Sequence, residues 1–263
     1  MAGLSRALIT GASSGIGRAL ALELAASGVT LHLAGRDATR LEATAAACRA
    51  RGAEVRTAVL DVRDRGAMEG WIAAAGPLDL VVANAGVSAG AGGNFVEPAG
   101  QIRAILAINV DGMLNTVLPA LAVMAGQPRG ADGVAGRIAV IASIAGLVAV
   151  PGSAAYCAAK AAADAWTVAT APAARAQGVV LTSVCPGYIR TAMTDGNQFP
   201  MPGLMDADRA ARIILRGVAA GRVRVAFPWW MAAAARFAEL LPPRWFAAMA
   251  VKRQGKGPDP ALL

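Results

Sequence analysis

Cysteine, histidine and tyrosine are scarce in this chain of 263 residues, which contains three, one and two of them respectively. The cysteines are odd in number and show no metal-ligand spacing, which argues against a disulfide framework and against a metal site. We therefore expect Cys48, Cys157 and Cys185 to be buried, reduced thiols. The single histidine, His32, lies in an apolar run and is interpreted as structural.

Long apolar runs are absent as well. No stretch reaches the roughly 20 residues that a membrane-spanning helix needs, and alanine supplies much of the 56% hydrophobic content. The first six residues lack the apolar core of a signal peptide, so we expect a cytoplasmic protein. The length suits the core of one large α/β domain or two small ones.

Acidic residues are few toward the C-terminus. The net charge is +8, and from Asp206 onward ten Lys and Arg face four Asp and Glu. A basic end suits nucleic acid, anionic lipid or an acidic ligand, although a solvated face is the commoner explanation. Because basic and aromatic residues do not alternate as they do in nucleic-acid modules, we expect no nucleic-acid partner.

The chain does contain a tyrosine and a lysine four residues apart, Tyr156 and Lys160, at the start of an alanine-rich helical pattern. On an α-helix this spacing puts both side chains on one face. A nearby ammonium favours the ionised phenol and lowers its pKa toward neutrality. The pair is therefore a candidate acid/base device, although the same spacing occurs on many solvated helix faces.

A glycine-rich turn, Thr10–Gly17, follows a short buried strand and opens a helix. This arrangement is typical of a dinucleotide site, in which the helix N-terminus faces the phosphates. Gly11 would permit the tight turn, Gly15 the approach of the backbone to a pyrophosphate, and Gly17 the close packing of helix on sheet. A loop that needs glycines for other reasons is the alternative.

The second predicted strand, 30–34, ends in Gly35, Arg36 and Asp37. In dinucleotide-binding folds the adenosine ribose lies at this point, where a guanidinium suits a 2′-phosphate and a carboxylate suits a 2′-hydroxyl. Arg36 favours NADP(H) over NAD(H), whereas the adjacent Asp37 weakens that preference.

Two further predicted strands also end in candidate binding residues. Strand 55–60 ends at Asp61 and strand 78–83 ends at Asn84. Because ligands bind outside the carboxyl ends of parallel strands, these residues and the glycine turn would converge. Asp61 would accept from an adenine amino group, and a helix-capping role is the equal alternative.

Two further polar residues are candidates for the site. Asn109 interrupts the apolar stripe of a long predicted helix, 98–124, where it would bond the backbone or hold a water if the helix loosens. Ser143 ends the predicted strand 137–143, thirteen residues before Tyr156. The two hydroxyls are thus positioned to flank one carbonyl group.

Strands and helices alternate throughout, and further strands are predicted at 179–184 and 223–227. The pattern predicts an α/β fold with a single Rossmann-type, doubly wound domain over 1–227. Its mainly seven-stranded parallel sheet would carry helices on both faces. A C-terminal helical extension, 228–263, would follow, and the apolar segment 193–205 would form a substrate lid.

Taken in order, these motifs resemble the short-chain dehydrogenase/reductase family over about residues 1–227. The resemblance implies an NAD(P)(H)-dependent oxidoreductase that transfers hydride between nicotinamide and a carbonyl or alcohol. It implies that Tyr156 is the acid/base, that Ser143 orients the substrate oxygen and that Lys160 binds the nicotinamide ribose while lowering the tyrosine pKa. Asn109 would hold the water of a proton relay.

The resemblance also implies a set of cofactor contacts and no metal. The implied contacts are Gly11, Ser13, Ser14, Gly15, Ile16, Gly17, Arg36, Asp61, Val62, Asn84, Ala85, Gly86, Tyr156, Lys160, Pro186, Gly187, Ile189 and Thr191. The last two would contact the nicotinamide carboxamide. A non-catalytic NAD(P)-binding sensor or scaffold on the same fold is the alternative, but both the tyrosine and the lysine are present.

Two features depart from the family pattern. Pro172 falls in the helix that bears Tyr156 and should kink or shorten it, which brings into question the usual interface of the expected homo-oligomer. The extension has two short apolar helices separated by Pro242 and Pro243. Its aromatic residues would pack on the substrate cleft or on another subunit, or 228–256 would lie on a membrane surface. Either arrangement suits an apolar carbonyl or alcohol substrate.

Overall fold

The computed structural model describes residues 4–92, 96–197, 199–242 and 256–262. Its main sheet is entirely parallel and has the strand order β3-β2-β1-β4-β5-β6-β9. The strands are β1 (Arg6–Thr10), β2 (Thr30–Gly35), β3 (Glu54–Val59), β4 (Leu80–Ala83), β5 (Gly136–Ile141), β6 (Val179–Pro186) and β9 (Arg224–Phe227). The order reverses between β1 and β4, as in a doubly wound fold, and the predicted fold class is confirmed.

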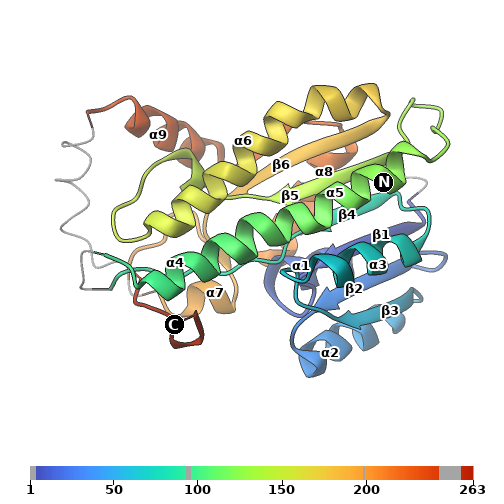
Figure 1. Cartoon of the computed structure of the whole chain (residues 1–263), viewed down its shortest axis with the longest axis horizontal. Helices are drawn as coiled ribbons and strands as arrows, with labels where there is room; N and C mark the ends of the chain where they lie inside the picture. Colours follow the sequence, from blue (N-terminus) through green and yellow to red (C-terminus); the bar gives the residue numbers. More distant parts are fainter. Residues whose placement is uncertain (1–3, 93–95, 198, 243–255, 263) are drawn as a thin grey trace.

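Helices cover both faces of this sheet (Figure 1). They are α1 (Gly15–Leu24), α2 (Ala38–Arg49), α3 (Arg65–Ala75), α4 (Ala99–Leu106), α5 (Gly112–Ala125), α6 (Ala154–Ala176), α7 (Ala192–Asp195), α8 (Ala207–Ala219) and α9 (Trp229–Glu239). Shorter helical turns are η1 (Ala107–Asp111), η2 (Ile144–Leu147) and η3 (Pro260–Leu262). Helices α3 to α6 pack on one face, and α1, α2 and α8 pack on the other.

The central strands are buried on both sides, which explains their continuous apolar sequence. Along β1, Leu8 packs into the layer of α3 to α6, whereas Ala7 and Ile9 pack into the layer of α1, α2 and α8. All three side chains are fully buried. His32 is also buried, within β2, and the three cysteines are free and buried, as expected.

The predicted helix 98–124 is present but contains a π-helical turn, η1, between α4 and α5. The expectation that no apolar stretch is long enough to span a membrane is wrong for 99–125, which passes as a membrane-spanning helix by length and composition. Ile105, Val117 and Met124 in this stretch are fully buried in the layer beneath the sheet. Core packing therefore accounts for part of its hydropathy, since 44% of the apolar window is buried.

The expectation that Pro172 shortens its helix is wrong. Helix α6 continues through Pro172 to Ala176. The proline is exposed, whereas Ala171 and Ala174 face the core. Proline has no N–H to donate to the Val168 carbonyl one turn earlier, and because the proline ring faces solvent, the core face of the helix packs without interruption.

The C-terminal part of the chain packs against the same core. Ala235 of α9 and Leu262 are buried with residues of the sheet. The second predicted helix of the extension, beyond Pro242, lies outside the described residues, and the division at residue 227 stays a prediction. A small parallel pair that the sequence did not predict, β7 (Ile189–Arg190) with β8 (Met205–Asp206), joins the two ends of the predicted lid.

Candidate active site

A cavity of about 1070 Å³ opens at the carboxyl ends of the sheet strands. The glycine turn, the ends of β2 to β6, the start of α6 and the predicted lid all contribute to its wall. This is the edge at which ligands bind in open α/β sheets, and the volume is at the upper end for small-molecule pockets.

The glycine turn has the backbone geometry that its sequence predicts. Gly11 and Gly15 adopt φ values of 65° and 53°, in the left-handed region that favours glycine. A Cβ atom on Gly17 would stand 2.5 Å from Asn84 Nδ2 and would also overlap the Gly11 carbonyl. Helix α1 therefore approaches the end of β1 as closely as it does because residue 17 is glycine.

The N-terminus of α1 is open toward the cavity. Its N-cap residue, Ser14, makes no capping hydrogen bond through its side chain, and the first turn contains no acidic residue. The amides of such a helix start are available to an anion, and the helix dipole favours one. The turn thus fits the pyrophosphate of a dinucleotide.

Asn84 fastens the glycine turn to the end of β4. Its Nδ2 donates to the carbonyl oxygens of Thr10 and Gly11 at 3.0 and 3.1 Å. Thr10 Oγ1 accepts in return from the amides of Asn84 and Ala85 at 3.1 and 3.2 Å. The two strand ends form one rigid floor beneath the cavity.

The carboxylate of Asp37 is engaged within its own helix. It caps α2 by accepting from the Arg40 amide at 2.9 Å and pairs with Arg40 Nε at 2.7 Å. These bonds hold the pKa of Asp37 below its usual value. Arg36 is exposed, and both arginines line the cavity beside the end of β2.

Asp61 lies at the cavity wall, but the predicted capping role belongs to another residue. Asp64 caps α3 by accepting from the Ala67 amide at 2.9 Å. Asp61 instead forms hydrogen bonds with the Arg63 guanidinium, the shortest of 2.6 Å, which lower the pKa of Asp61.

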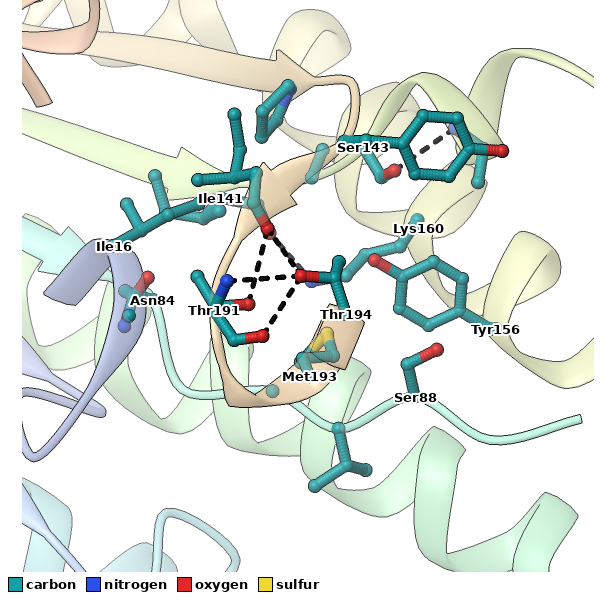
Figure 2. A pocket seen from close by; sticks show the side chains of 18 of the residues that line it. Ile16, Asn84, Ser88, Ile141, Ser143, Tyr156, Lys160, Thr191, Met193 and Thr194 are labelled. Atoms are coloured by element: carbon teal, nitrogen blue, oxygen red, sulfur yellow. Dashed lines mark hydrogen bonds between the residues drawn. The ribbon is translucent and has the colours of Figure 1, made fainter. Parts of the chain in front are cut away.

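Ser143, Tyr156 and Lys160 lie around the same part of the cavity (Figure 2). Lys160 Nζ is 5.8 Å from the centroid of the Tyr156 ring and donates to the Ile141 carbonyl at 2.7 Å. Ser143 Oγ accepts from the Ala145 amide at 3.0 Å. Helix α6 and the end of β5 thus bring together the three side chains that the sequence predicts to meet.

Burial dominates the electrostatics of this group. It raises the pKa of Tyr156, although a hydrogen bond with Ser143 opposes the increase. The expected lowering of the Tyr156 pKa by Lys160 is not observed, because desolvation by burial is the largest influence on the phenol. Burial also lowers the pKa of Lys160, to about 8.

Asn109 lies within the π-helical turn and behind the cavity wall. Its Oδ1 accepts from the Val87 amide and its Nδ2 donates to the Val87 carbonyl, both at 2.9 Å. A Cβ atom on Gly86 would stand 2.7 Å from Asn109 Oδ1 and 3.4 Å from Lys160 Nζ. Asn109, Gly86 and Lys160 are therefore close neighbours, and both amide atoms of Asn109 bond the backbone, which is the first of the two roles considered for it.

The other end of the cavity is mostly apolar. It is lined by Val148, Val150, Met193, Phe199, Trp230 and Met231, among others. The residues of the predicted lid that belong to this wall are Met193, Thr194, Asn197, Phe199, Pro200 and Pro202. Trp230 lies beside Gly203. The neighbouring Trp229 is instead 77% exposed.

Every predicted site residue except Gly17 and Asn109 lines the cavity directly. The sequence prediction missed Arg40, Ser88, Thr194 and Lys256, which also line it. Arg40 follows Arg36 by four residues, and Thr194 forms a capping box with Thr191. Arg40 and Thr194 therefore had a local signal in the sequence. Ser88 and Lys256 had none. Among the described residues no group of three or more His, Cys, Asp or Glu side chains could hold a metal.

Comparison with known proteins agrees with this geometry. A family model described as short chain dehydrogenase matches residues 5–199. An "Uncharacterized oxidoreductase" from Myxococcus xanthus is 37% identical over 248 residues, which cover 93% of this chain and 95% of that protein. "Probable oxidoreductase EphD" from Mycobacterium tuberculosis is 36% identical over 200 residues, and the match covers 74% of this chain but only 33% of that longer protein.

A solved structure shares both fold and extent. The short chain dehydrogenase/reductase from Burkholderia phymatum in complex with NAD is 26% identical, with a TM-score of 0.79 over 97% of this chain and 98% of that one. The family model covers most of the sheet and the residues around the cavity. The chain therefore belongs to the short-chain dehydrogenase/reductase family of nicotinamide-dependent oxidoreductases, which transfer hydride between the cofactor and a carbonyl or alcohol group.

Proposed function

We propose that the protein is an NADP(H)-preferring carbonyl reductase or alcohol dehydrogenase that acts on an apolar substrate, with Tyr156 as its acid/base. One observation carries the proposal: Tyr156, Lys160 and Ser143 share a cavity with the glycine turn, at the carboxyl edge of the sheet. A sensor or scaffold protein would have no need of this arrangement of hydroxyls and ammonium.

The proposed cofactor contacts follow the cavity wall. The glycine turn, with Ser13, Ser14 and Ile16, would hold the pyrophosphate at the start of α1. Further along the wall, Asp61 and Val62 would contact the adenine, and Asn84, Ala85 and Gly86 would support the adjacent ribose. Pro186, Gly187, Ile189 and Thr191 would contact the nicotinamide end, and Lys160 its ribose. When bound, this cofactor supplies or takes up the hydride.

The protein's own residues manage the proton. Tyr156 donates its phenolic proton to the substrate oxygen during reduction and accepts it during oxidation. Ser143 Oγ already accepts from Ala145 N, so the serine hydroxyl proton can be donated to the same substrate oxygen. Two donors aimed at that oxygen stabilise the negative charge that develops there. The protonated Lys160 ammonium would favour the ionised form of Tyr156. Asn109 would hold the water of the proton relay.

The preference for NADP(H) rests on the charges beside the end of β2. Arg36 is an exposed guanidinium at the cavity wall, while the neighbouring Asp37 carboxylate is paired with Arg40. An arginine suits a 2′-phosphate, and a carboxylate that caps a helix is poorly available to a 2′-hydroxyl. Arg36→Ala should reduce kcat/KM for NADPH by roughly tenfold, the loss of about one charge-assisted contact, with little change for NADH. Arg222→Ala, at the opposite edge of the sheet, is the control, and an unchanged cofactor ratio in Arg36→Ala would reject this role.

The apolar substrate is inferred from the lining of the cavity end beyond Ser143. Val148, Val150, Phe199 and Trp230 meet there, and side chains of this kind favour an aliphatic or aromatic ketone over a sugar. A panel of ketones and alcohols, followed by nicotinamide absorbance, would identify the class. Turnover of polyols alone would contradict the inference.

The decisive test of the proposed function is Tyr156→Phe. Loss of a positioned acid/base should lower kcat by about 10³-fold, while cofactor affinity, measured by fluorescence titration, stays within about twofold. The chain offers a matched control, Tyr188→Phe, because Tyr188 also lines the cavity and packs on Phe199 at a ring-centroid distance of 6.0 Å. Retention of most activity by Tyr156→Phe would reject the proposal.

Further proposals concern the setting of the enzyme. We propose a cytoplasmic homo-oligomer whose extension 228–256 contacts a membrane surface through α9, where Trp229, Phe237 and Leu240 are 77%, 66% and 81% exposed. Flotation with anionic vesicles, compared between the native chain and Trp229→Ser/Phe237→Ser, tests the membrane contact. Equal flotation would exclude it, and light scattering on the same samples would show whether this face instead joins subunits.

A further inference from the structure

The helix that bears Tyr156 is capped from a distant part of the chain. Its N-cap residue, Ser153, makes no capping hydrogen bond through its side chain. Instead the Ala155 amide donates to Glu97 Oε2 at 2.8 Å, across 58 positions in sequence. Glu97 is only 6% exposed. A buried glutamate thus takes the place of the local cap, one residue before Tyr156.

Glu97 is itself held by a second buried polar side chain. Gln101, which is fully buried, donates through Nε2 to Glu97 Oε1 at 3.4 Å and to the Gly90 carbonyl at 3.2 Å. Gln101 Oε1 accepts from the Asp259 amide at 3.0 Å. A chain of hydrogen bonds therefore runs from residue 259 to the first turn of α6.

The segment 256–262 is anchored where this chain of bonds begins. The Gly90 amide donates to the Gly257 carbonyl at 3.1 Å, and the Gly92 amide donates to the Lys256 carbonyl at 2.9 Å. Leu262 is buried in the core, and Figure 1 shows this end of the protein beside α4 and α7. The segment packs closely against Gly90. A Cβ atom at that position would lie 2.7 Å from the Gly152 carbonyl oxygen and would overlap the Lys256 carbonyl oxygen.

The same segment also reaches the predicted lid. Lys256 lines the cavity and its Nζ donates to the Met193 carbonyl at 3.0 Å, at the start of α7. The segment therefore contacts the lid directly and the catalytic helix through two side chains. Its position in the sequence, about one hundred residues beyond Tyr156, gives no indication of this.

We infer that Glu97 is a positioning residue for Tyr156 and that segment 256–262 supports it through Gln101. A carboxylate at a helix N-terminus satisfies an amide that has no partner within the helix and interacts favourably with the helix dipole. Because the bond falls on Ala155, it fixes the turn from which the phenol projects. The inference rests on the proposed role of Tyr156 as the acid/base.

The polarity of the network makes Glu97→Gln a sharp test. The glutamine keeps the shape, but its amide can accept from Ala155 only by turning its NH₂ toward the NH₂ of Gln101. In the opposite orientation the oxygen of the new glutamine accepts from Gln101, but its NH₂ then faces the Ala155 amide, so that two donors meet there instead. One of the two hydrogen bonds is therefore lost in either orientation, and the first turn of α6 should loosen.

We expect Glu97→Gln to lower kcat by roughly tenfold to a hundredfold, as expected for a small displacement of a reacting group, with KM for both substrates within about twofold. Amide exchange of Ala155 should accelerate by at least about tenfold, because the amide loses its partner. This second measurement reports the cap whether or not Tyr156 is the acid/base.

Exchanging the two side chains should rescue the variant. In Glu97→Gln/Gln101→Glu the new glutamine can accept from Ala155 and donate to the new glutamate, which still accepts from Asp259. The bond to the Gly90 carbonyl is lost and a carboxylate oxygen then faces that carbonyl, so we expect partial recovery, with kcat at least about threefold above that of Glu97→Gln. Glu69→Gln removes a carboxylate from an exposed position on α3 and is the control for charge alone.

The outcomes are separable. Native kcat and native Ala155 exchange in Glu97→Gln would overturn the inference, as would a change in KM alone. Accelerated exchange with unchanged kcat would confirm the cap but reject its catalytic role. Should Glu97→Gln not fold, Gln101→Leu breaks the network one step further from the helix, and the same two measurements apply. If Tyr156→Phe is fully active, the proposed function fails, whatever the exchange data show.

Discussion

The two halves of the cavity are built in different ways. The proposed cofactor half consists of the glycine turn and the ends of β2, β3 and β4, and its shape comes from backbone and from the hydrogen bonds of Asn84 and Thr10. The proposed substrate half consists of η2, the predicted lid, α9 and Lys256, and its shape comes from apolar side chains. The first half is continuous with the sheet, whereas the second is assembled from segments far apart in sequence.

This difference indicates which half of the cavity tolerates amino-acid substitution. Backbone that must approach a ligand closely depends on glycine and on strand ends, so few sequences can build it. Side chains on loops and surface helices can be exchanged without altering the sheet. The cofactor half should therefore be fragile and the substrate half adaptable, and the three predictions below test that contrast.

The largest effect is expected where the halves meet, at Lys160. Lys160→Met should lower kcat by about 10³-fold, since the phenol loses its neighbouring cation. The same variant should be more stable by about 2 kcal/mol at pH 7, because a buried ammonium is replaced by an apolar chain at the loss of one hydrogen bond. Steady-state kinetics and thermal unfolding measure the two effects.

The stability gain should depend on pH. Burial lowers the pKa of Lys160 from 10.5 to about 8, so between these values the unfolded chain binds a proton that the folded chain has released. The contribution of Lys160 to native stability therefore rises as pH increases through this window. The difference in Tm between variant and native protein should shrink from pH 7 to pH 10, and a difference that widens would contradict the assigned burial.

A smaller effect is expected in the cofactor half. Gly17→Ala puts a methyl group against the Gly11 carbonyl and Asn84, so α1 must move and cofactor affinity should fall by about a hundredfold. Gly70→Ala is the matched control, because a Cβ atom there meets nothing within 4 Å. The control should raise stability by about 0.5–1 kcal/mol. Equal cofactor affinity in both variants, measured by calorimetry, would show that the turn is not fragile.

The smallest effect is expected in the substrate half. Trp230→Ala enlarges the cavity and removes the contact with Gly203, so KM for an apolar ketone should rise about fivefold through lost apolar contact, while cofactor affinity stays unchanged. Trp229→Ala, one position away and outside the cavity wall, serves as the control. A larger loss in Trp229→Ala than in Trp230→Ala would reverse the assignment of the two tryptophans.

The sequence predicted the sheet and the cofactor half well. Strand boundaries agree to within two residues, and the largest differences are at the start of β4 and at the ends of β5 and β6. The reason is local, because a continuous apolar run followed by a glycine or polar residue defines both the strand and its ligand-facing end. Asn84 and Gly17 were located correctly because each follows or opens such an element.

Other features depend on contacts that no local pattern carries. Helix α6 tolerates Pro172 because that position faces solvent, and the π-helical turn at Asn109 depends on how the helix packs against Val87. The hydrogen bonds of Glu97, Gln101 and Lys256 depend on how the end of the chain packs back against α4. The direction in which the Tyr156 pKa shifts also depends on burial. The spacing of residues in the sequence does not reveal burial.

The buried cysteines give the protein a built-in chemical reporter. Thiolates, not thiols, react with alkylating reagents, and burial raises the pKa of Cys48, Cys157 and, to about 12, Cys185. Cys157 lies at the cavity wall, whereas Cys48 is a residue of α2, in the helix layer on the other side of the sheet. Iodoacetamide should therefore modify Cys157 and Cys48 at different rates. One labelling time course would then distinguish local opening of the cavity from global unfolding.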